Sequence, residues 1–262
     1  MKKIGFMAIY NDIDYINYTL KSFLDFVDEM IVVEGAFKIT MEGGKPPRSN
    51  DGTLEILKQY EADKKITLIH ANLQEHKFHY DIGYQEAVKR EADWAIMCDS
   101  DEIWTKQAKV FANNAMKANL HRDACELRVD EYCFINDFKT WYPGTYPRIF
   151  KCKKDSFFVF DNEVQFSGYN RGQHYIASVP GGRQIYHYGY VRDNKRWRMK
   201  QDYMYAKDHN PINLRYKLEG DKYIIPSDIP IYEFKGKHPE VMLDHKFYNK
   251  KANEIIYGDK SE

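Results

Sequence analysis

Three acidic side chains come straight after an apolar run in the segment ADWAIMCDSDEIW, residues 92–104: Asp99, Asp101 and Glu102. A buried carboxylate without a partner is too costly to keep ionised, so these acids must reach water or a cation. On an extended chain Asp99 and Asp101 would face the same side. Two hard oxygen ligands beside an open position suit Mg²⁺ or Mn²⁺, which take further ligands from water and phosphate. The segment therefore predicts a surface turn or a metal site that binds a diphosphate.

Alternating strands and helices fill the N-terminal 104 residues. The hydrophobic patterns predict strands at 3–10, 29–35, 65–71 and 93–99 and helices at 13–27, 53–62 and 80–92. Repeated βα units with short connections imply a mostly parallel sheet with helices on both faces and a site along the carboxyl ends of its strands. The acidic segment falls at such an end, which favours a functional site over a plain turn.

The pattern changes after Trp104. It predicts a helix at 107–120, strands at 124–137, 148–152, 155–166 and 182–191, and a last helix at 193–209. Glycine and proline separate these strands, so we expect antiparallel additions that complete one wall of a cleft. The sequence contains no internal repeat and no low-complexity linker, which favours a single domain over residues 1–262.

Composition excludes some functions. Lys plus Arg and Asp plus Glu both number 39, which gives no support to general polyanion binding. The four cysteines show no C-x-x-C spacing and predict buried free thiols in a reducing compartment, without a zinc site. No window approaches the roughly 18 apolar residues of a membrane span, and the first apolar run is too short for a signal peptide. These features predict a soluble cytoplasmic protein.

The order of the polar segments resembles the GT-A fold glycosyltransferases, especially glycosyltransferase family 2 and its relatives. The resemblance covers about residues 3–205 and rests on Asp99-Ser100-Asp101, Tyr10-Asn11-Asp12, Glu34, SNDGT (49–53) and HYGYVR (187–192). It implies an α/β GT-A fold with a mostly parallel central sheet, helices on both faces and a smaller antiparallel acceptor-side extension. The nucleotide-sugar-binding half would be 1–104 and the acceptor-side half 105–210, with 211–262 a C-terminal extension.

Metal ligands follow from the resemblance. Asp101 is similar to the principal ligand of a divalent cation, Mn²⁺ or Mg²⁺, and Asp99 to the acid that contacts the ribose, or the metal through water. His187 is similar to a late histidine that completes the metal shell. From the residues alone a structural role for His187 stays open. Glu102 is expected to contact the metal ligands without binding the metal itself. The alternative is that Glu102 is a solvated residue of a turn.

Donor contacts follow in the same way. Asn11 and Glu34 are similar to nucleoside contacts, although the family more often has Asp where Glu34 stands, and Asp51 would line the same pocket. As a plainer role, Asp51 could be a helix cap. In the segment RDNKRWRMK (192–200), cations such as Arg192 and Arg196 would stabilise a leaving diphosphate, unless the run is a solvated helix face.

Acceptor-side residues lie in the second half. Trp141, Tyr142 and Tyr146 would hold the acceptor, or they belong to an ordinary aromatic core. Arg148 would bridge donor and acceptor. An inverting reaction needs a carboxylate base, whereas a retaining one does not. The candidate bases are Asp130, Glu131, Asp137, Asp161 and Glu163, of which we favour Glu163 and then Asp137.

The predicted function is that of a metal-dependent glycosyltransferase that moves a sugar from a nucleotide sugar, a UDP-sugar, to an acceptor hydroxyl. The acceptor could be a saccharide, a lipid-linked saccharide, a protein or a modified nucleobase. A sugar nucleotidyltransferase would need a glycine-rich loop after the first strand, and AIYNDIDYI contains no glycine. A non-catalytic nucleotide- or glycan-binding protein is the other alternative. Such a binding protein could lose the metal ligands, whereas this chain keeps Asp99, Asp101 and His187, which favours catalysis.

Overall fold

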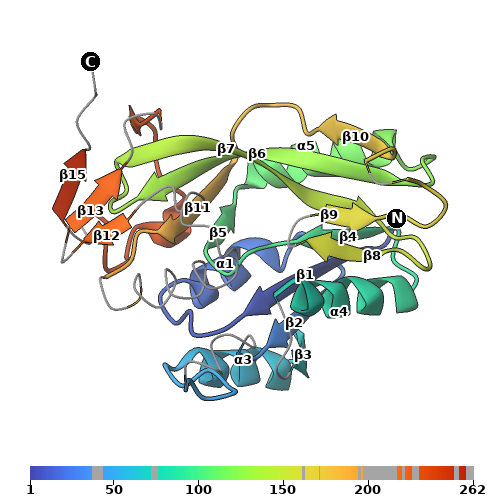
Figure 1. Cartoon of the computed structure of the whole chain (residues 1–262), viewed down its shortest axis with the longest axis horizontal. Helices are drawn as coiled ribbons and strands as arrows, with labels where there is room; N and C mark the ends of the chain where they lie inside the picture. Colours follow the sequence, from blue (N-terminus) through green and yellow to red (C-terminus); the bar gives the residue numbers. More distant parts are fainter. Residues whose placement is uncertain are drawn as a thin grey trace. The chain divides into compact units, whose positions relative to one another are not determined.

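The computed structural model describes residues 1–36, 44–71, 76–160, 163–170, 172–193, 196, 217–219, 222–225, 230–250 and 254–257. The chain divides into two compact units. Figure 1 labels the helices and strands. The first unit takes residues 1–131 and 145–185, and the second takes residues 132–144 and 186–262. The boundary between the units therefore does not fall at Trp104, where the sequence pattern changes. Whether the two units combine into the single predicted domain stays a prediction.

Parallel strands form the centre of the first unit. Its elements up to residue 118 are β1 (Lys3–Ile9), α1 (Ile16–Phe23), β2 (Glu29–Glu34), α3 (Thr53–Ala62), β3 (Thr67–His70), α4 (His76–Lys89), β4 (Trp94–Met97), β5 (Glu102–Trp104) and α5 (Lys106–Ala118). The strand order is β3-β2-β1-β4-β7. β1 pairs in parallel with both β2 and β4, and β2 pairs in parallel with β3. The predicted α/β class with a mostly parallel sheet is confirmed for this part of the chain.

The order of these strands creates a switch point between β1 and β4. The chain runs outward from β1 through β2 to β3 and then returns to place β4 on the other side of β1. In open α/β sheets the crevice for a ligand forms at the carboxyl ends of the strands where the order reverses. The segments after Ile9 and after Met97 leave the sheet at this point.

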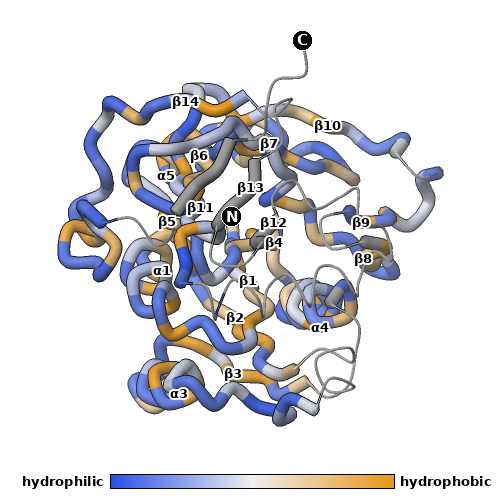
Figure 2. The backbone as a smooth tube through the Cα atoms, turned by 60° about the vertical axis from the view of Figure 1, so that its left-hand side comes forward, coloured by the Kyte–Doolittle hydropathy of each residue, from blue (hydrophilic) through white to orange (hydrophobic). Residues whose placement is uncertain are grey.

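Alternate residues of the central strands face two different helix layers. On β1, Phe6 and Ala8 pack in a cluster with Tyr80 and Tyr84 of α4. The intervening β1 residues belong to a second cluster, whose helical members from α1, α3 and α5 are Ile16, Leu20, Phe23, Leu57, Ala108, Ala112, Ala115 and Met116. Because neighbouring residues of a strand point to opposite faces, this pattern confirms helices on both faces. Figure 2 shows that α3 and α4 carry both hydrophilic and hydrophobic residues.

The remaining elements are mostly antiparallel or short. They are β6 (Cys125–Ile135), β7 (Thr140–Lys151), β8 (Phe157–Phe160), β9 (Glu163–Gln165), β10 (Tyr175–Ser178), β11 (Ile185–Tyr190), β12 (Lys217–Glu219), β13 (Lys222–Ile225), β14 (Tyr232–Glu233), the 3₁₀ helix η2 (Glu240–Met242) and β15 (Glu254–Tyr257). In the first unit β7 pairs antiparallel with β4, and β8 pairs antiparallel with β9. The predicted antiparallel additions are therefore present.

Several element boundaries differ from the prediction: α4 begins at 76 rather than 80, and the strand predicted at 155–166 is instead the two strands β8 and β9. Two further differences have a clear cause. Helix α1 covers 16–23 rather than 13–27, because a turn in which Tyr15 and Ile16 donate to the Asp12 carbonyl precedes it. Strand β7 begins at Thr140, well before the predicted 148, although Pro143 and Pro147 locally disfavour a strand. Pairing of its first residues with β14 overrides that local preference. Most of the predicted helix at 193–209 lies outside the described residues.

The second unit is built around aromatic side chains. Strands β6 and β7 run into it from the first unit, and β14 pairs antiparallel with β7. Phe134 stacks on Tyr188 with ring centroids 5.0 Å apart, and Trp141 meets Tyr132 edge-on at 4.7 Å. Tyr142, which we expected to hold the acceptor, is buried. Much of the aromatic content of this unit therefore forms its core.

Cysteines and hydropathy add two observations. All four cysteines are free, and Cys98, Cys125 and Cys133 are buried as predicted. Burial raises the pKa of the Cys98 thiol well above its usual value, which keeps this thiol protonated and unreactive. Among the described residues, no helix combines the length and the apolar character that crossing a bilayer requires.

Close packing of α4 on β1 yields a stability prediction. Gly83 lies where a Cβ atom would come within 2.9 Å of the Cβ and Cδ2 atoms of Phe6. We expect Gly83→Ala to destabilise the protein by about 1–3 kcal/mol, because overpacking outweighs the gain in helix propensity. Urea unfolding measures this, with Lys89→Ala on the exposed face of α4 as the control, expected within about 0.5 kcal/mol of the parent. A more stable Gly83→Ala protein would contradict the packing.

Candidate active site

A turn carries the acids that follow β4. The Glu102 N–H donates a hydrogen bond to the Asp99 carbonyl oxygen at 3.1 Å, and Ser100 and Asp101 are the middle residues of this turn. The expectation of an extended segment, with Asp99 and Asp101 alternating, is therefore wrong. The turn forms because β5 begins only a few residues after β4 ends. The Asp99 side chain is 25% exposed, whereas Asp101 and Glu102 are buried.

A buried guanidinium group lies among three carboxylates. Arg148 of β7 pairs with Asp99 at 3.1 Å and with Glu131 at 2.9 Å, and it also pairs with Glu102. The Arg148 side chain is 4% exposed, and Glu102 and Glu131 are fully buried. Arginine suits this position because its planar group offers five N–H donors in fixed directions. The cluster ties β7 and β6 to the turn after β4.

The carboxylates of this cluster fix the charge of Arg148. Burial alone would lower the pKa of Arg148, but Glu102, Glu131 and Asp99 outweigh it and raise that pKa well above its usual value. The guanidinium therefore stays charged at every physiological pH. Asp101 is a further buried acid of the same turn.

The predicted donor contact of Arg148 meets a geometric obstacle. Its Nη2 and Nε atoms both face carboxylates of the cluster, and Nη1 donates to the Pro147 carbonyl at 3.5 Å. The guanidinium has little exposed surface left for a ligand. The structure therefore places Arg148 where it holds the acids of the turn in position. Nearby, the Tyr146 ring lies 5.1 Å from the Arg148 guanidinium carbon and covers it.

Hydroxyl groups connect the turn to its neighbours. Tyr80 of α4 donates its O–H to Asp99 Oδ1 at 2.6 Å, and Thr19 of α1 donates its O–H to the Ser100 carbonyl at 2.7 Å. The Ser100 hydroxyl donates to the carboxylate of Asp12, which follows β1. The carboxyl ends of β1 and β4 are thus joined directly. Neither Tyr80 nor Ser100 was predicted, because nothing in their local sequence distinguishes them.

The segment 48–53 closes over the ends of β1, β2 and β3. Glu34 is fully buried, accepts the Ser49 N–H at 2.7 Å and lies 3.1 Å from His70 Nδ1. Asn11 Oδ1 accepts the Asn50 N–H at 2.9 Å, and the Asn11 backbone is left-handed with φ of 52°. The predicted nucleoside contacts Asn11 and Glu34 therefore lie together, with His70 as an unpredicted member of the group.

Asp51 combines two local roles. Its Oδ1 accepts the Thr53 N–H at 3.0 Å at the start of α3, and its Oδ2 accepts the Ile13 N–H at 3.2 Å. The cap residue of α3 is Gly52, so Asp51 is not itself the cap, although it accepts the first N–H of the helix. The second contact fixes the chain after β1. Asp51 thus belongs to the same end of the sheet as Asn11, and its predicted contact with the donor stays a prediction.

Candidate bases differ in their accessibility. Glu131 is taken up in the Arg148 cluster, and Asp130 Oδ1 accepts the Thr145 hydroxyl at 2.7 Å. Asp161 lies outside the described residues. Glu163 is half-buried at the start of β9, whose partner β8 is fixed to α4 by the Phe158 N–H, which donates to Asp81 Oδ1 at 2.9 Å. The hairpin therefore packs on the helix that also carries Tyr80.

The other predicted residues belong to the second unit. His187 is a half-buried residue of β11. A ring nitrogen of His187 lies within 4.8 Å of the Cys133 Sγ atom. The buried Arg192 donates from Nε to the Gly189 carbonyl at 2.8 Å. The Arg196 N–H donates to Asp193 Oδ1 at 3.0 Å. Asp101 belongs to the first unit, so the predicted common site of His187, Arg192 and Arg196 with Asp101 stays a prediction.

Asp137 has a structural role. Its Oδ1 accepts the N–H groups of Lys139 and Thr140 at 2.9 and 2.7 Å, and the residue is buried. These bonds shape the turn between β6 and β7. One oxygen of Asp137 is therefore engaged, and its predicted role as a base stays a prediction. The other basic residues of the segment 192–200 lie outside the described residues.

No protein-family model matches the sequence, and no curated protein does. Among solved structures, the chain is similar to S. aureus TarS in complex with UDP, at 20% identity, 48% of this chain, 35% of that chain and a TM-score of 0.36. A structure of S. aureus TarS residues 1–349 matches at 15% identity over 71% of this chain and 60% of that chain, with a TM-score of 0.44. The chain is also similar to the mannosyltransferase PcManGT from Pyrobaculum calidifontis in complex with GDP-Man and Mn²⁺. That match has 18% identity over 51% of this chain and 35% of that chain, with a TM-score of 0.35.

These matches are partial. The chain spans between 21% and 60% of the length of the solved structures named in these comparisons, and the identities are 20% or lower. At TM-scores below 0.5 such likenesses carry no argument about function. The proposal that follows rests on the residues of the site.

The buried guanidinium of Arg148 yields a second stability prediction. We expect Arg148→Met to lower the free energy of unfolding at pH 7 by about 3–5 kcal/mol, because the buried Glu102 and Glu131 and the partly exposed Asp99 lose the guanidinium that pairs with them. Arg148→Lys should recover part of this loss, since an ammonium group restores the positive charge but not the planar set of N–H donors that contacts several carboxylates at once. Arg90→Met is the control, because Arg90 pairs with Glu29 and Glu86 near the surface and should cost about 1 kcal/mol or less. Equal losses for Arg148→Met and Arg90→Met would contradict the cluster.

Proposed function

We propose that this protein is a metal-dependent glycosyltransferase that moves a sugar from a nucleotide sugar, a UDP-sugar, to an acceptor hydroxyl. The observation that carries the proposal is the position of the acidic turn. Asp99, Ser100 and Asp101 follow β4 at the point where the strand order reverses, and Ser100 is bonded to Asp12 at the end of β1. Ligands of open α/β sheets bind at such a point.

The acids fit a divalent cation. Carboxylate oxygens are the ligands that Mg²⁺ and Mn²⁺ prefer, and both cations also take ligands from phosphate. Asp99 is partly exposed, with its side chain 25% accessible at the turn. Asp99 and Asp101 would hold the cation. When bound, it would neutralise charge on the diphosphate of the donor.

The nucleoside would bind beside this turn. Asn11, Asp51 and the segment around Ser49 lie at the carboxyl ends of β1 and β2, next to the switch point. Glu34 is buried beneath this segment, where its carboxylate accepts the Ser49 N–H and lies close to the partly exposed His70. We infer that Glu34 shapes the nucleoside pocket through these two residues. This differs from the direct contact that the resemblance implies.

Transfer would need a base and a stabilised leaving group. Glu163 would accept the proton of the acceptor hydroxyl while the hydroxyl oxygen of the acceptor forms a bond to the anomeric carbon of the donor sugar. The bond from that carbon to the diphosphate breaks, and its electron pair leaves with the diphosphate. Arg192 and Arg196 would stabilise the negative charge that develops there. Arg148 would act on the reaction only through the acids that it positions.

The metal site yields a binding prediction. UDP with Mn²⁺ should raise the melting temperature of the parent protein more than UDP or Mn²⁺ alone, because a ligand that binds the folded state stabilises it. Asp101→Asn should lose the Mn²⁺-dependent part of the shift while its own melting temperature without ligands stays near that of the parent. Asp63→Asn, at an exposed site beside Lys65, is the control. An unchanged Mn²⁺-dependent shift in Asp101→Asn would remove Asp101 from the site.

The proposed base yields an activity prediction. Release of UDP from UDP-glucose, UDP-galactose and UDP-N-acetylglucosamine is measured with Mn²⁺ and candidate acceptors. Glu163→Gln should reduce transfer by about 10²- to 10⁴-fold, the usual contribution of a general base, and should keep the UDP shift. Glu233→Gln, an exposed acid of β14, should keep full transfer. Transfer that survives Glu163→Gln would indicate another base or a retaining mechanism.

A further inference from the structure

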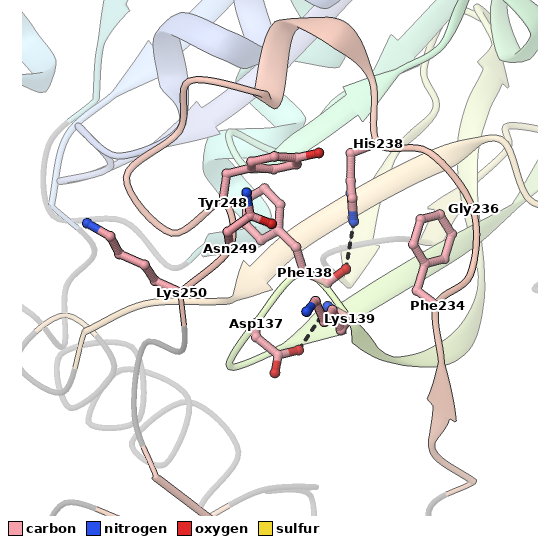
Figure 3. Close-up of a pocket in the computed structure, with 9 residues that line it drawn as sticks. All are labelled: Asp137, Phe138, Lys139, Phe234, Gly236, His238, Tyr248, Asn249 and Lys250. Carbon is pink, nitrogen blue, oxygen red and sulfur yellow. Dashed lines mark hydrogen bonds between the residues drawn. The ribbon is translucent and has the colours of Figure 1, made fainter.

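The second unit contains a cavity of about 310 Å³ that none of the residues predicted to bind the donor lines. Its walls are Asp137, Phe138, Lys139, Phe234, Gly236, His238, Tyr248, Asn249 and Lys250 (Figure 3). They come from the turn between β6 and β7 and from the segment 234–250. The volume lies at the lower end of the roughly 300–1,000 Å³ of small-molecule sites. It suits a ligand of one or two sugar rings.

Aromatic rings form one side of this cavity. Figure 3 shows the rings of Phe138, Phe234 and Tyr248 around the imidazole of His238. The His238 centroid lies 4.7 Å from that of Phe234 and 6.0 Å from that of Tyr248, and Tyr248 meets Phe138 edge-on at 5.8 Å. Phe234 and Tyr248 are only partly buried. They therefore keep ring surface that a ligand could cover.

The imidazole of His238 is held in one state. Its Nε2 lies 2.6 Å from the Phe138 carbonyl oxygen, which can only accept, so Nε2 carries the proton. Nδ1 then accepts the Tyr188 O–H at 2.7 Å. Burial lowers the pKa of His238, and the bond to Phe138 opposes this shift without cancelling it. A neutral ring fixed at both nitrogens gives the cavity a rigid wall without a charge.

Polar groups also line the cavity. Lys139, Asn249 and Lys250 are exposed, and the Asp137 carboxylate already accepts two backbone N–H groups. Aromatic walls of this kind also suit quaternary ammonium ligands. Here two ammonium groups line the cavity against one carboxylate that is already hydrogen-bonded, so a cation would be repelled. The ligand must have an apolar face and uncharged or anionic polar groups.

We propose that this cavity binds a pyranose ring of a saccharide. A pyranose presents C–H groups on one face, which can stack on Tyr248 or Phe234, and hydroxyls along its edge, which can bond to Asn249, Lys139 and Asp137. Binding of the sugar requires neither nucleotide nor metal. That the bound sugar belongs to the acceptor rests on the proposed function, and it would select saccharide acceptors over proteins and nucleobases.

Saturation-transfer NMR on the whole chain tests the proposal without nucleotide or metal. The probes are methyl β-glucopyranoside, N-acetylglucosamine and glucuronate, with choline as the cationic comparison. We expect transfer to at least one sugar, strongest at its ring C–H protons, and none to choline. Transfer to choline alone, or to no probe, would overturn the proposal. The UDP and Mn²⁺ thermal shift, measured on the same sample, reports separately on the donor site.

Variants locate the bound sugar. Tyr248→Ala should weaken binding on the order of tenfold, because it removes a stacking ring, whereas Tyr248→Phe should retain it. Tyr232→Ala is the matched control, since Tyr232 is an exposed tyrosine of the same unit that packs against Trp141 and does not line the cavity. Unchanged binding in Tyr248→Ala, with the melting temperature of the parent, would place the sugar elsewhere and overturn the assignment.

Discussion

The buried contact of Arg148 with Asp99, Glu102 and Glu131 is the interaction on which the geometry of the acidic turn depends. Carboxylates this deeply buried stay ionised only beside a compensating charge. The guanidinium supplies that charge from β7 and links it to acids on β6 and on the turn after β4. The same contact therefore holds in place the turn on which the proposed metal ligands Asp99 and Asp101 lie.

The parallel sheet decides where this turn lies. Strand β4 returns to the far side of β1, so the segments after both strands leave the sheet together. Hydrogen bonds from Ser100 to Asp12 and from Tyr80 to Asp99 then connect the two segments and α4. A site of this kind is assembled from elements that are far apart in the sequence, which explains why few of its members stand out locally.

The second unit uses its aromatic residues in two ways. Phe134, Tyr188 and Tyr142 are interior side chains that stabilise the unit by packing. Phe234 and Tyr248 instead keep part of their rings accessible beside a hollow with polar groups at its rim. Composition cannot separate these uses, since both draw on the same residue types. Only the exposed face of each ring distinguishes packing from binding.

The sequence alone determined the βα alternation, the burial of the strand before Asp99 and the gathering of polar residues at strand ends, because hydrophobic periodicity is a local property. It also drew attention to Asp99, Asp101, Asn11 and Glu34. Tertiary structure decided that Asp99 to Glu102 is a turn and that Glu34 lies beneath Ser49. It also decided that Arg148 belongs to the acids. The Arg148 contacts join residues up to 49 positions apart and exist only once β4, β7 and β6 lie side by side, whereas the Glu34 contact needs the segment after β2 to fold back over that strand.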